Sequence, residues 1–286
     1  MSRIIALRGA VVGILLFIIC IIWFPNSDSH HNSTALTVQF LDVGQGDAIL
    51  IQTPDGYEML IDGGPSSQVL SALARRRSFF DRSIDVVIAT HPDTDHIAGL
   101  VDVLNRYNIG TIIETAAEHD APAAIAFEKA AGNENAQIIT AAAGQQIQLG
   151  ASTTIRVFSP YGDTRKWENN AASVVVQIEY GEIEFMLTGD APSSIEKYLA
   201  DTYGERLQSD VLKLGHHGSK TSSSEEFLKQ VQPQYAVVSS GKDNRYGHPH
   251  EEVVTRASAA GAQLVSTAEL GTIIFKTDGK RVWIEK

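Results

Sequence analysis

Short apolar segments that lead directly into histidine and aspartate constrain this chain more than any other sequence feature. The apolar run 84–89 is followed by the sequence THPDTDH, which begins at Thr90. Six of the nine histidines lie in three such clusters, namely His91 and His96, His216 and His217, and His248 and His250. Functional residues gather in loops just beyond strand ends, because the sheet holds them rigidly while the loop exposes them. The pattern therefore predicts a site at the edge of a sheet.

Strand-like and helical segments are interspersed from Leu36 onward, which predicts one layered α/β domain over residues 36–286. The composition, 43% hydrophobic and 20% charged, is that of a globular chain that can bury a core. We expect strands at 36–41, 48–52, 57–61, 84–89, 111–114, 137–140, 147–149, 154–158, 174–179, 184–187, 210–214, 235–239, 263–266, 272–276 and 282–284. We expect helices at 69–80, 97–107, 116–136, 196–203, 224–230 and 251–260.

The N-terminus has a different character. Residues 9–24 carry no charge, and the apolar stretch approaches the roughly 20 residues that a bilayer requires. We therefore predict a transmembrane anchor at 1–24 and a polar linker at 25–35. A cleaved signal peptide is the alternative, but no small-x-small cleavage site follows. Because Arg3 and Arg8 precede the span, the sequence predicts a single-pass membrane protein with an extracytoplasmic domain.

The segment from His91 to His96 is the densest group of metal-ligand residue types. A tight loop points alternate side chains toward a common centre, so His91 and Asp93 can share one metal ion while Asp95 and His96 share a second. Imidazole and carboxylate ligands suit zinc, manganese or iron and do not suit calcium. A helix N-cap would explain one of the aspartates but not all four residues. The segment therefore predicts two bound divalent metal ions.

Further residues of these types follow other predicted strands. Asp190 comes after the run EFML, and its carboxylate could bridge two metal ions with one oxygen on each. His216 and His217 follow LKLG; one would complete the ligands of the second metal ion, and the other would either support a ligand or contact the substrate. His248 is predicted to act as a proton donor or to contact a phosphate, although Pro249 also suits a simple helix start.

Six motifs occur in a characteristic order: FLDVGQGDAILIQ, LIDGG, THPDTDHIAG, LTGD, LKLGHHGSKTSSS and NRYGHPH. Together they resemble the metallo-β-lactamase superfamily, and more closely the hydrolase domain of the ComEC/Rec2 competence proteins, over residues 36–286. The resemblance implies an αββα sandwich with a dinuclear metal site between the loop edges of its two sheets. It also implies metal-dependent hydrolysis, with DNA phosphodiesters as the suspected substrate in the competence relatives.

The chain departs from the superfamily pattern at two places. Asp93 stands where the general motif has a histidine, as in the competence branch, and this extra carboxylate favours manganese as an alternative to zinc. The superfamily's third ligand histidine has no clear counterpart. His119 lies in an alanine-rich segment without a preceding strand, whereas Asn169, Asn170 and Ser173 lie nearer the expected place and could supply an oxygen contact.

The predicted function is that of a membrane-anchored phosphodiesterase or nuclease, in which two metal ions activate a water molecule. The predicted catalytic residues are Asp95, His248 and Lys220. Ser219, Ser222, Lys220 and His248 are the residues expected to contact a phosphate of the substrate, for which single-stranded DNA is a candidate. The membrane spans of a DNA channel do not occur in the sequence, so a role in DNA uptake would require a separate channel protein.

Several residues are expected to support the site without binding metal. Asp62 is predicted to orient the loop that carries His91, and Asn170 is a second candidate for this role. Asp42 and Asp47 either form a turn or face the site. The formal net charge of -11 argues against a broad basic groove for nucleic acid. The alternatives are hydrolysis of another bond, such as a lactone or β-lactam, and a non-catalytic metal-binding module of an uptake system.

Overall fold

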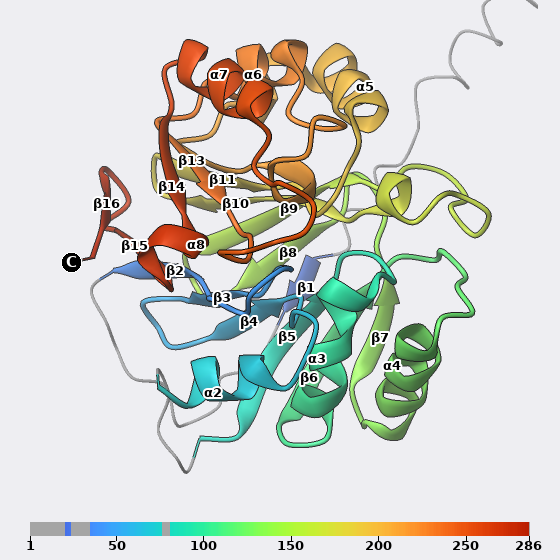
Figure 1. The fold of residues 1–286 in the computed structure, drawn as a ribbon. Helices are drawn as coiled ribbons and strands as arrows, with labels where there is room; N and C mark the ends of the chain where they lie inside the picture. The colour runs from blue at the N-terminus through green and yellow to red at the C-terminus, as the bar shows by residue number, and fades with distance from the viewer. Residues whose placement is uncertain (1–20, 24–34, 76–80, 286) are drawn as a thin grey trace, which may run out of the picture.

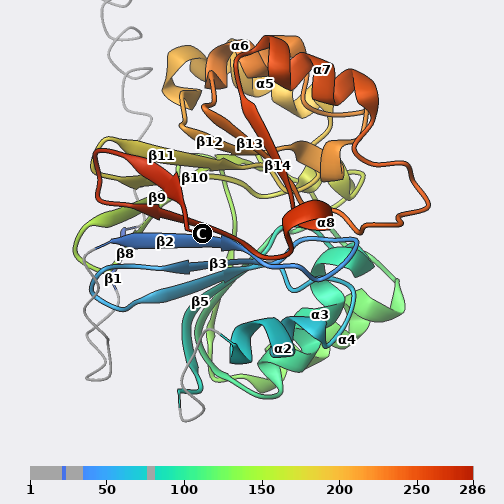
Figure 2. The same cartoon turned by 60° about the vertical axis from the view of Figure 1, so that its left-hand side comes forward.

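The computed structural model describes residues 21–23, 35–75 and 81–285, and it arranges them in four layers (Figure 1). Two eight-stranded sheets lie face to face in the middle, and helices cover the outer face of each sheet (Figure 2). The predicted α/β sandwich is therefore confirmed. Buried side chains fill the three spaces between these four layers, with one core between the sheets and one beneath each group of helices.

The first sheet has the strand order β16-β15-β2-β3-β4-β5-β6-β7. Its strands are β2 (Leu36–Phe40), β3 (Ile49–Gln52), β4 (Glu58–Ile61), β5 (Ser83–Ala89), β6 (Asn108–Glu114), β7 (Gln137–Thr140), β15 (Ile273–Thr277) and β16 (Val282–Ile284). The second sheet has the order β1-β8-β9-β10-β11-β12-β13-β14. Its strands are β1 (Ile21–Trp23), β8 (Gln146–Leu149), β9 (Thr153–Ser159), β10 (Val175–Tyr180), β11 (Ile183–Leu187), β12 (Val211–Lys213), β13 (Tyr235–Val238) and β14 (Gln263–Ser266).

Each sheet has its own layer of helices (Figures 1 and 2). The first sheet is covered by α2 (Gln68–Ala74), α3 (Thr94–Leu104) and α4 (Pro122–Asn133). The second is covered by α5 (Ser193–Tyr203), α6 (Glu225–Val231) and α7 (Glu251–Ala259). A short helix, α8 (Thr267–Leu270), follows β14, and single turns form η1 (Asn170–Ala172), η2 (Gly204–Leu207) and η3 (Gly215–Gly218).

The core between the sheets follows from the alternation of side chains along each strand. In β3, Ile49 enters this core, whereas the next residue, Leu50, packs beneath the helices of the first sheet. The ring of Phe275 in β15 lies 5.9 Å from that of Phe40 in β2 and 6.2 Å from that of Phe185 in β11, measured between centroids. These three buried rings therefore join the first sheet to the second.

Parallel strand pairing decides where the loops meet. Strands β4 to β7 run parallel to one another, and so do β11 to β14. Parallel strands end at the same edge of a sheet, so the loops that follow them gather there. Asp62 follows β4, the segment from His91 to His96 follows β5, Asp190 follows β11, and His216 and His217 follow β12. The topology thus assembles residues that are far apart in the sequence.

The predicted N-terminal organisation requires a correction. Within the part of the chain that the structure describes, no helix is both long and apolar enough to cross a membrane. This finding contradicts the predicted single-pass membrane localisation and the extracytoplasmic placement that rested on it. Residues 1–20 of the predicted anchor and residues 25–34 of the predicted linker lie outside the described residues. Ile21–Trp23, which the prediction included in the anchor, forms β1 and pairs in parallel with β8 instead.

The packing between the sheets makes a stability prediction. Replacing the fully buried Phe275 by alanine (Phe275→Ala) leaves a cavity where three rings meet, and we expect the free energy of unfolding to fall by about 3–5 kcal/mol. Trp283, on the neighbouring strand β16, is 39% exposed, so Trp283→Ala should change it by only about 0.5 kcal/mol. Urea unfolding of both variants measures the difference; equal losses would contradict this account of the core.

Candidate metal centre

Three imidazole rings are held so that their Nε2 atoms point toward one place. The Nδ1 atom of His96 lies 2.7 Å from Asp62 Oδ2, that of His217 lies 2.9 Å from the carbonyl oxygen of Ser239, and that of His91 lies 3.0 Å from Thr90 Oγ1. Each ring is thus fixed through Nδ1. The three Nε2 atoms are buried and have no hydrogen-bond partner among the described residues.

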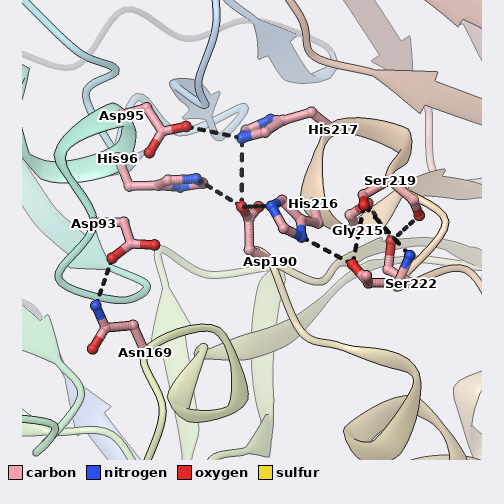
Figure 3. A network of polar contacts seen from close by, with 12 residues as sticks. Asp93, Asp95, His96, Asn169, Asp190, Gly215, His216, His217, Ser219 and Ser222 are labelled. Carbon is pink, nitrogen blue, oxygen red and sulfur yellow. Dashed lines mark hydrogen bonds and ion pairs between the residues drawn. The ribbon is translucent and has the colours of Figure 1, made fainter. Parts of the chain in front are cut away.

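Asp190 Oδ2 lies at the point where these rings converge (Figure 3). It is 3.4 Å from Nε2 of His96, 3.4 Å from Nε2 of His217, 3.9 Å from Nε2 of His216 and 4.0 Å from Nε2 of His91. A single carboxylate oxygen therefore faces four imidazole nitrogens, although the four histidines come from two different sheets.

The other oxygen of Asp190 is engaged by a buried lysine. Lys213 Nζ lies 3.4 Å from Asp190 Oδ1, donates to the carbonyl oxygen of Gly189 at 2.8 Å, and forms an ion pair with Asp47. The Lys213 side chain is fully buried. Only Oδ2 faces the histidines, and the expectation that Asp190 offers one oxygen to each of two metal ions stays a prediction.

The donor atoms around Asp190 Oδ2 fall into two groups. In the first, Asp95 Oδ2 lies 3.3 Å from His217 Nε2, and the Nε2 atom of His96 completes the group. In the second, Asp93 Oδ2 lies 3.6 Å from His91 Nε2. The structure thus brings His91 and Asp93 together, as the spacing predicts, and it places Asp95 beside His217. The two groups have Asp190 Oδ2 in common.

Four buried side chains offer ligand atoms that lie within 4.8 Å of one another: Asp47, His96, Asp190 and His217. Asp47 approaches the two rings at Nδ1, at 3.5 Å from His217 and 3.9 Å from His96. Those nitrogens are already bonded elsewhere, and Asp47 itself pairs with Lys213. Asp95 approaches on the side of the free Nε2 atoms, so we place Asp95 rather than Asp47 among the atoms that face a cation.

The residues present fit a metal ion. A buried nitrogen without a hydrogen bond costs free energy, and a cation bound between these three atoms and the carboxylate oxygen would satisfy them. Fixing the Nδ1 atom of a histidine through a carboxylate or carbonyl is also the usual way to orient a ligand imidazole. Carboxylates and imidazoles together suit zinc or manganese. The cluster is therefore a candidate metal-binding site.

The charges of the metal-free site are strongly coupled. Burial by itself would raise the pKa of Asp190, but His217, His96 and Lys213 lower it well below its usual range. Burial would lower the pKa of His217, but Asp190 and neighbouring carboxylates raise it to about 9. Burial would also lower the pKa of His96, but Asp190 and Asp62 raise it well above its ordinary value. In the metal-free protein, protonated imidazoles thus supply the positive charge that the carboxylates require.

The two adjacent histidines are aimed by an unusual backbone. His216 and His217 have φ angles of 48° and 56°, in the left-handed region, where a non-glycine residue costs roughly 1–3 kcal/mol. Ser222 holds this turn, because its hydroxyl donates to the carbonyl oxygens of Gly215 at 2.5 Å and of Ser219 at 3.0 Å. The turn lets the His217 ring face Asp95, while the His216 ring, which is 31% exposed, also points toward Asp190 (Figure 3).

Two residues that the sequence places near the substrate are enclosed instead. Ser222 is fully buried, and its hydroxyl donates to backbone oxygens, so its role is to support the turn rather than to meet a phosphate. Ser219 is 5% exposed, and its hydroxyl lies 3.0 Å from that of Thr221. Lys220 is exposed at the rim, where its amide donates to His250 Nδ1 at 3.2 Å.

His248 lies at the mouth of the site. Its ring centroid is 5.7 Å from that of His216 and 6.4 Å from that of His217. Partial burial and these two neighbouring histidines lower the pKa of His248 to about 4. The ring is therefore neutral near pH 7 in the metal-free protein. This favours the predicted phosphate contact through a hydrogen bond over the predicted proton donor.

Two predicted supporting residues lie away from the metal-facing atoms. Asp42 is exposed, and its Oδ1 accepts from the amide of Gly44 at 3.2 Å, so it forms the turn after β2. Asn170 Oδ1 has no hydrogen-bond partner among the described residues. Its neighbour Asn169 reaches the site instead, because its Nδ2 donates to Asp93 Oδ1 at 2.6 Å. Ser173 Oγ accepts from the amide of Asp190 at 3.2 Å.

Asp62 lies beneath the loop that follows β5, where the sequence predicts it. Its two oxygens accept from the amide and the hydroxyl of Thr90, at 2.8 Å and 2.7 Å. Lys213 is the residue that sequence reasoning missed. It lies inside an apolar run, in a strand that should be buried on both faces. A charged residue in such a strand was the only sign in the sequence that it has a special role.

The chain is similar in sequence to proteins of one known family. The sequence model of the metallo-beta-lactamase superfamily matches residues 41–242. The chain is 29% identical over 256 residues to ComE operon protein 3 of Bacillus subtilis, covering 84% of this chain and 33% of that protein. It is 30% identical over 244 residues to competence protein ComA of Neisseria gonorrhoeae, covering 85% of this chain and 32% of that protein. The chain therefore spans about a third of the length of these relatives.

A solved structure shows the same fold. The metallo-beta-lactamase fold protein YhfI from Bacillus subtilis has a TM-score of 0.57 and 15% identity, with 85% of this chain and 100% of that chain covered. Together with the sequence matches, this confirms the resemblance that the motifs predict.

The pKa values predict proton release on metal binding. In the metal-free protein His96 and His217 are protonated at pH 7, because the pKa of each is raised, that of His217 to about 9. A metal ion needs a neutral Nε2 atom, so binding should release about two protons and should strengthen by about tenfold per pH unit for each proton released. Calorimetry with zinc or manganese in buffers of different ionisation enthalpy measures this number. Binding without proton release would contradict the assignment of these two rings.

The buried ion pair predicts the effect of removing its cation. Lys213→Met leaves the carboxylates of Asp47 and Asp190 buried without their counter-charge, so the free energy of unfolding of the metal-free protein should fall by about 3–5 kcal/mol. Adding Asp47→Asn removes one of those charges and should restore part of the loss, as measured by urea unfolding. An additive loss in the double variant would show that the pairing is not responsible.

Proposed function

Because the chain belongs to the metallo-β-lactamase superfamily, we propose that it is a metal-dependent phosphodiesterase that cleaves nucleic acid, with single-stranded DNA as its substrate. The observation that carries the proposal is the convergence of three buried, unpartnered Nε2 atoms on Asp190 Oδ2. Two relatives carry the names ComE operon protein 3 and competence protein ComA, which supports a substrate connected with DNA uptake.

The two groups of donor atoms suggest two metal ions, zinc or manganese. Asp95, His96 and His217 would hold one ion, and His91 and Asp93 would hold the other. When bound, such ions supply an activated water molecule and positive charge for the phosphoryl oxygens. The second group has one imidazole whereas the first has two, and an asparagine, Asn169, lies against Asp93. We therefore expect the second group to bind metal more weakly.

The surrounding residues keep the ligand atoms in position before any ion arrives. Asp62 and the Ser239 carbonyl oxygen hold the protons of His96 and His217 on Nδ1, so each Nε2 atom can act as a ligand. Lys213 holds Asp190 Oδ1, so Oδ2 is the atom shared by the two groups. This preorganisation means that little free energy is spent on rearrangement when substrate binds.

Residues at the rim suit a phosphodiester. Lys220 is exposed beside the histidine turn and provides a cation for a non-bridging phosphate oxygen. His248 is neutral near pH 7 and provides a hydrogen bond. A lactone or a β-lactam has no comparable use for this cation, which is why we prefer phosphodiester cleavage. Within an uptake system the domain would act beside a separate channel protein, and a non-catalytic role there is the competing proposal.

Substitution of the shared carboxylate tests the proposal. We expect Asp62→Asn to lower cleavage of single-stranded DNA and of bis-p-nitrophenyl phosphate by about 10- to 100-fold, as is typical of a residue that supports a metal ligand. We expect Asp190→Asn to lower cleavage of both substrates by more than this. EDTA should abolish the activity, and manganese or zinc should restore it. Asp201→Asn, an exposed position on α5, is the matched control and should leave the rate unchanged.

The outcomes separate the competing functions. Cleavage of a lactone but not of either phosphodiester would favour the other hydrolase. A folded protein that binds zinc or manganese but cleaves none of these substrates would favour the non-catalytic module. Phosphodiester cleavage that survives both Asp190→Asn and EDTA would refute the proposed centre.

A further inference from the structure

The loop between β13 and α7 lies beside the histidine turn and is held by several hydrogen bonds. Asn244 fastens it from within: its Nδ2 donates to the carbonyl oxygens of Gly241 at 2.9 Å and His248 at 2.7 Å, and its Oδ1 accepts from the amide of His248 at 2.9 Å. The amide of His250 donates to the carbonyl oxygen of Gly218 at 3.0 Å. The loop is therefore joined to the histidine turn rather than free to move away from it.

This loop carries a row of rings that leads outward from the candidate metal centre. His248 contacts His216 and His217, and the ring of Tyr246 stacks on His248 with centroids 5.6 Å apart and an interplanar angle of 23°. Tyr246 is 49% exposed, so part of its ring is accessible. The guanidinium of Arg245 lies 5.0 Å from the Tyr246 ring centroid and donates to its hydroxyl at 2.8 Å.

The exposed cations near the site are few and lie on this loop. The loop bears Lys242 and Arg245, accompanied by Asp243, and Lys220 lies in the histidine turn that the loop contacts. The acids Glu251 and Glu252 follow at the start of α7. In a chain with a net charge of -11, these cations give a polyanion only a local contact, so a further source of binding is needed.

We propose that Tyr246 and Arg245 form a stacking shelf for an unpaired base of single-stranded nucleic acid, next to the phosphate that lies at the metal centre. The inference rests on the proposed function for the position of that phosphate, and it adds a subsite for the neighbouring base. Bases stack on aromatic rings and on guanidinium planes, and each such contact contributes about as much as a strong hydrogen bond. Only an unpaired base presents the free face that stacking requires, so the shelf selects single strands over duplexes.

The shelf also explains how an acidic domain can select nucleic acid without a basic groove. Base stacking is insensitive to charge, and it takes over part of the binding that phosphate contacts provide in basic proteins. His248 links the shelf to the centre, because its ring touches Tyr246 on one side and His216 on the other. A base on the shelf thus lies one ring away from the residues that face Asp190.

The test removes the base while keeping the charge. A short fluorescent oligothymidylate and the same oligonucleotide with abasic residues carry equal numbers of phosphates. We expect the full-length protein, with manganese, to bind the first about tenfold more tightly by fluorescence anisotropy. Tyr246→Ala should remove this difference, and Tyr246→Phe should keep most of it. Trp283→Ala removes an exposed aromatic on a distant strand of the first sheet and should leave the difference intact.

Each outcome has a separate meaning. Equal binding of the two oligonucleotides by the unaltered protein, a difference that persists in Tyr246→Ala, or no binding of either probe would overturn the shelf. If base-dependent binding is found but no phosphodiester is cleaved, the shelf stands and the proposed enzymatic function fails. If both phosphodiesters are cleaved but the base makes no difference, the proposed function stands and the shelf fails.

Discussion

A buried lysine joins the two halves of this molecule. Lys213 ends β12 in the second sheet, and Asp47 lies in the turn that follows β2 in the first, so their ion pair crosses the interface directly beneath the candidate metal centre. Burying such charges is costly unless each finds a partner. Lys213 meets this condition through Asp47, Asp190 and the Gly189 carbonyl oxygen. The pair sets the position of Asp190, and the rest of the site is arranged around that carboxylate.

The site stores strain and charge that the fold must compensate. Two adjacent histidines occupy left-handed backbone conformations, and three imidazoles keep unpartnered nitrogens in a buried space. Such features persist only where the surrounding structure holds them in place. Here the restraints come from Ser222 under the histidine turn and from the large apolar core between the sheets. The stability that the core provides thus offsets the cost of holding the ligand atoms in position at the strand ends.

Much of this arrangement could be predicted from the sequence because the strands are strongly apolar and the ligand residues follow them closely. The expected strand at 84–89 is β5, Ser83–Ala89, and in the loop after it His91 lies beside Asp93, as predicted. Other expectations failed where partners distant in sequence decide the outcome. The helix predicted at 116–136 begins only at Pro122, and Ser222 turns inward to a backbone oxygen rather than outward to a substrate.

The sequence by itself determined the layered α/β class and the short segments that carry histidines and aspartates, because periodicity and local spacing are properties of the chain alone. The resemblance of its six ordered motifs indicated the family. The tertiary structure alone decided which oxygen of Asp190 faces the rings, which asparagine reaches Asp93, and that a lysine inside an apolar strand supports the centre. It also showed that Ile21–Trp23 pairs with β8. These outcomes depend on contacts between segments far apart in the chain, and local pattern carries no information about the partner that a buried polar group will find.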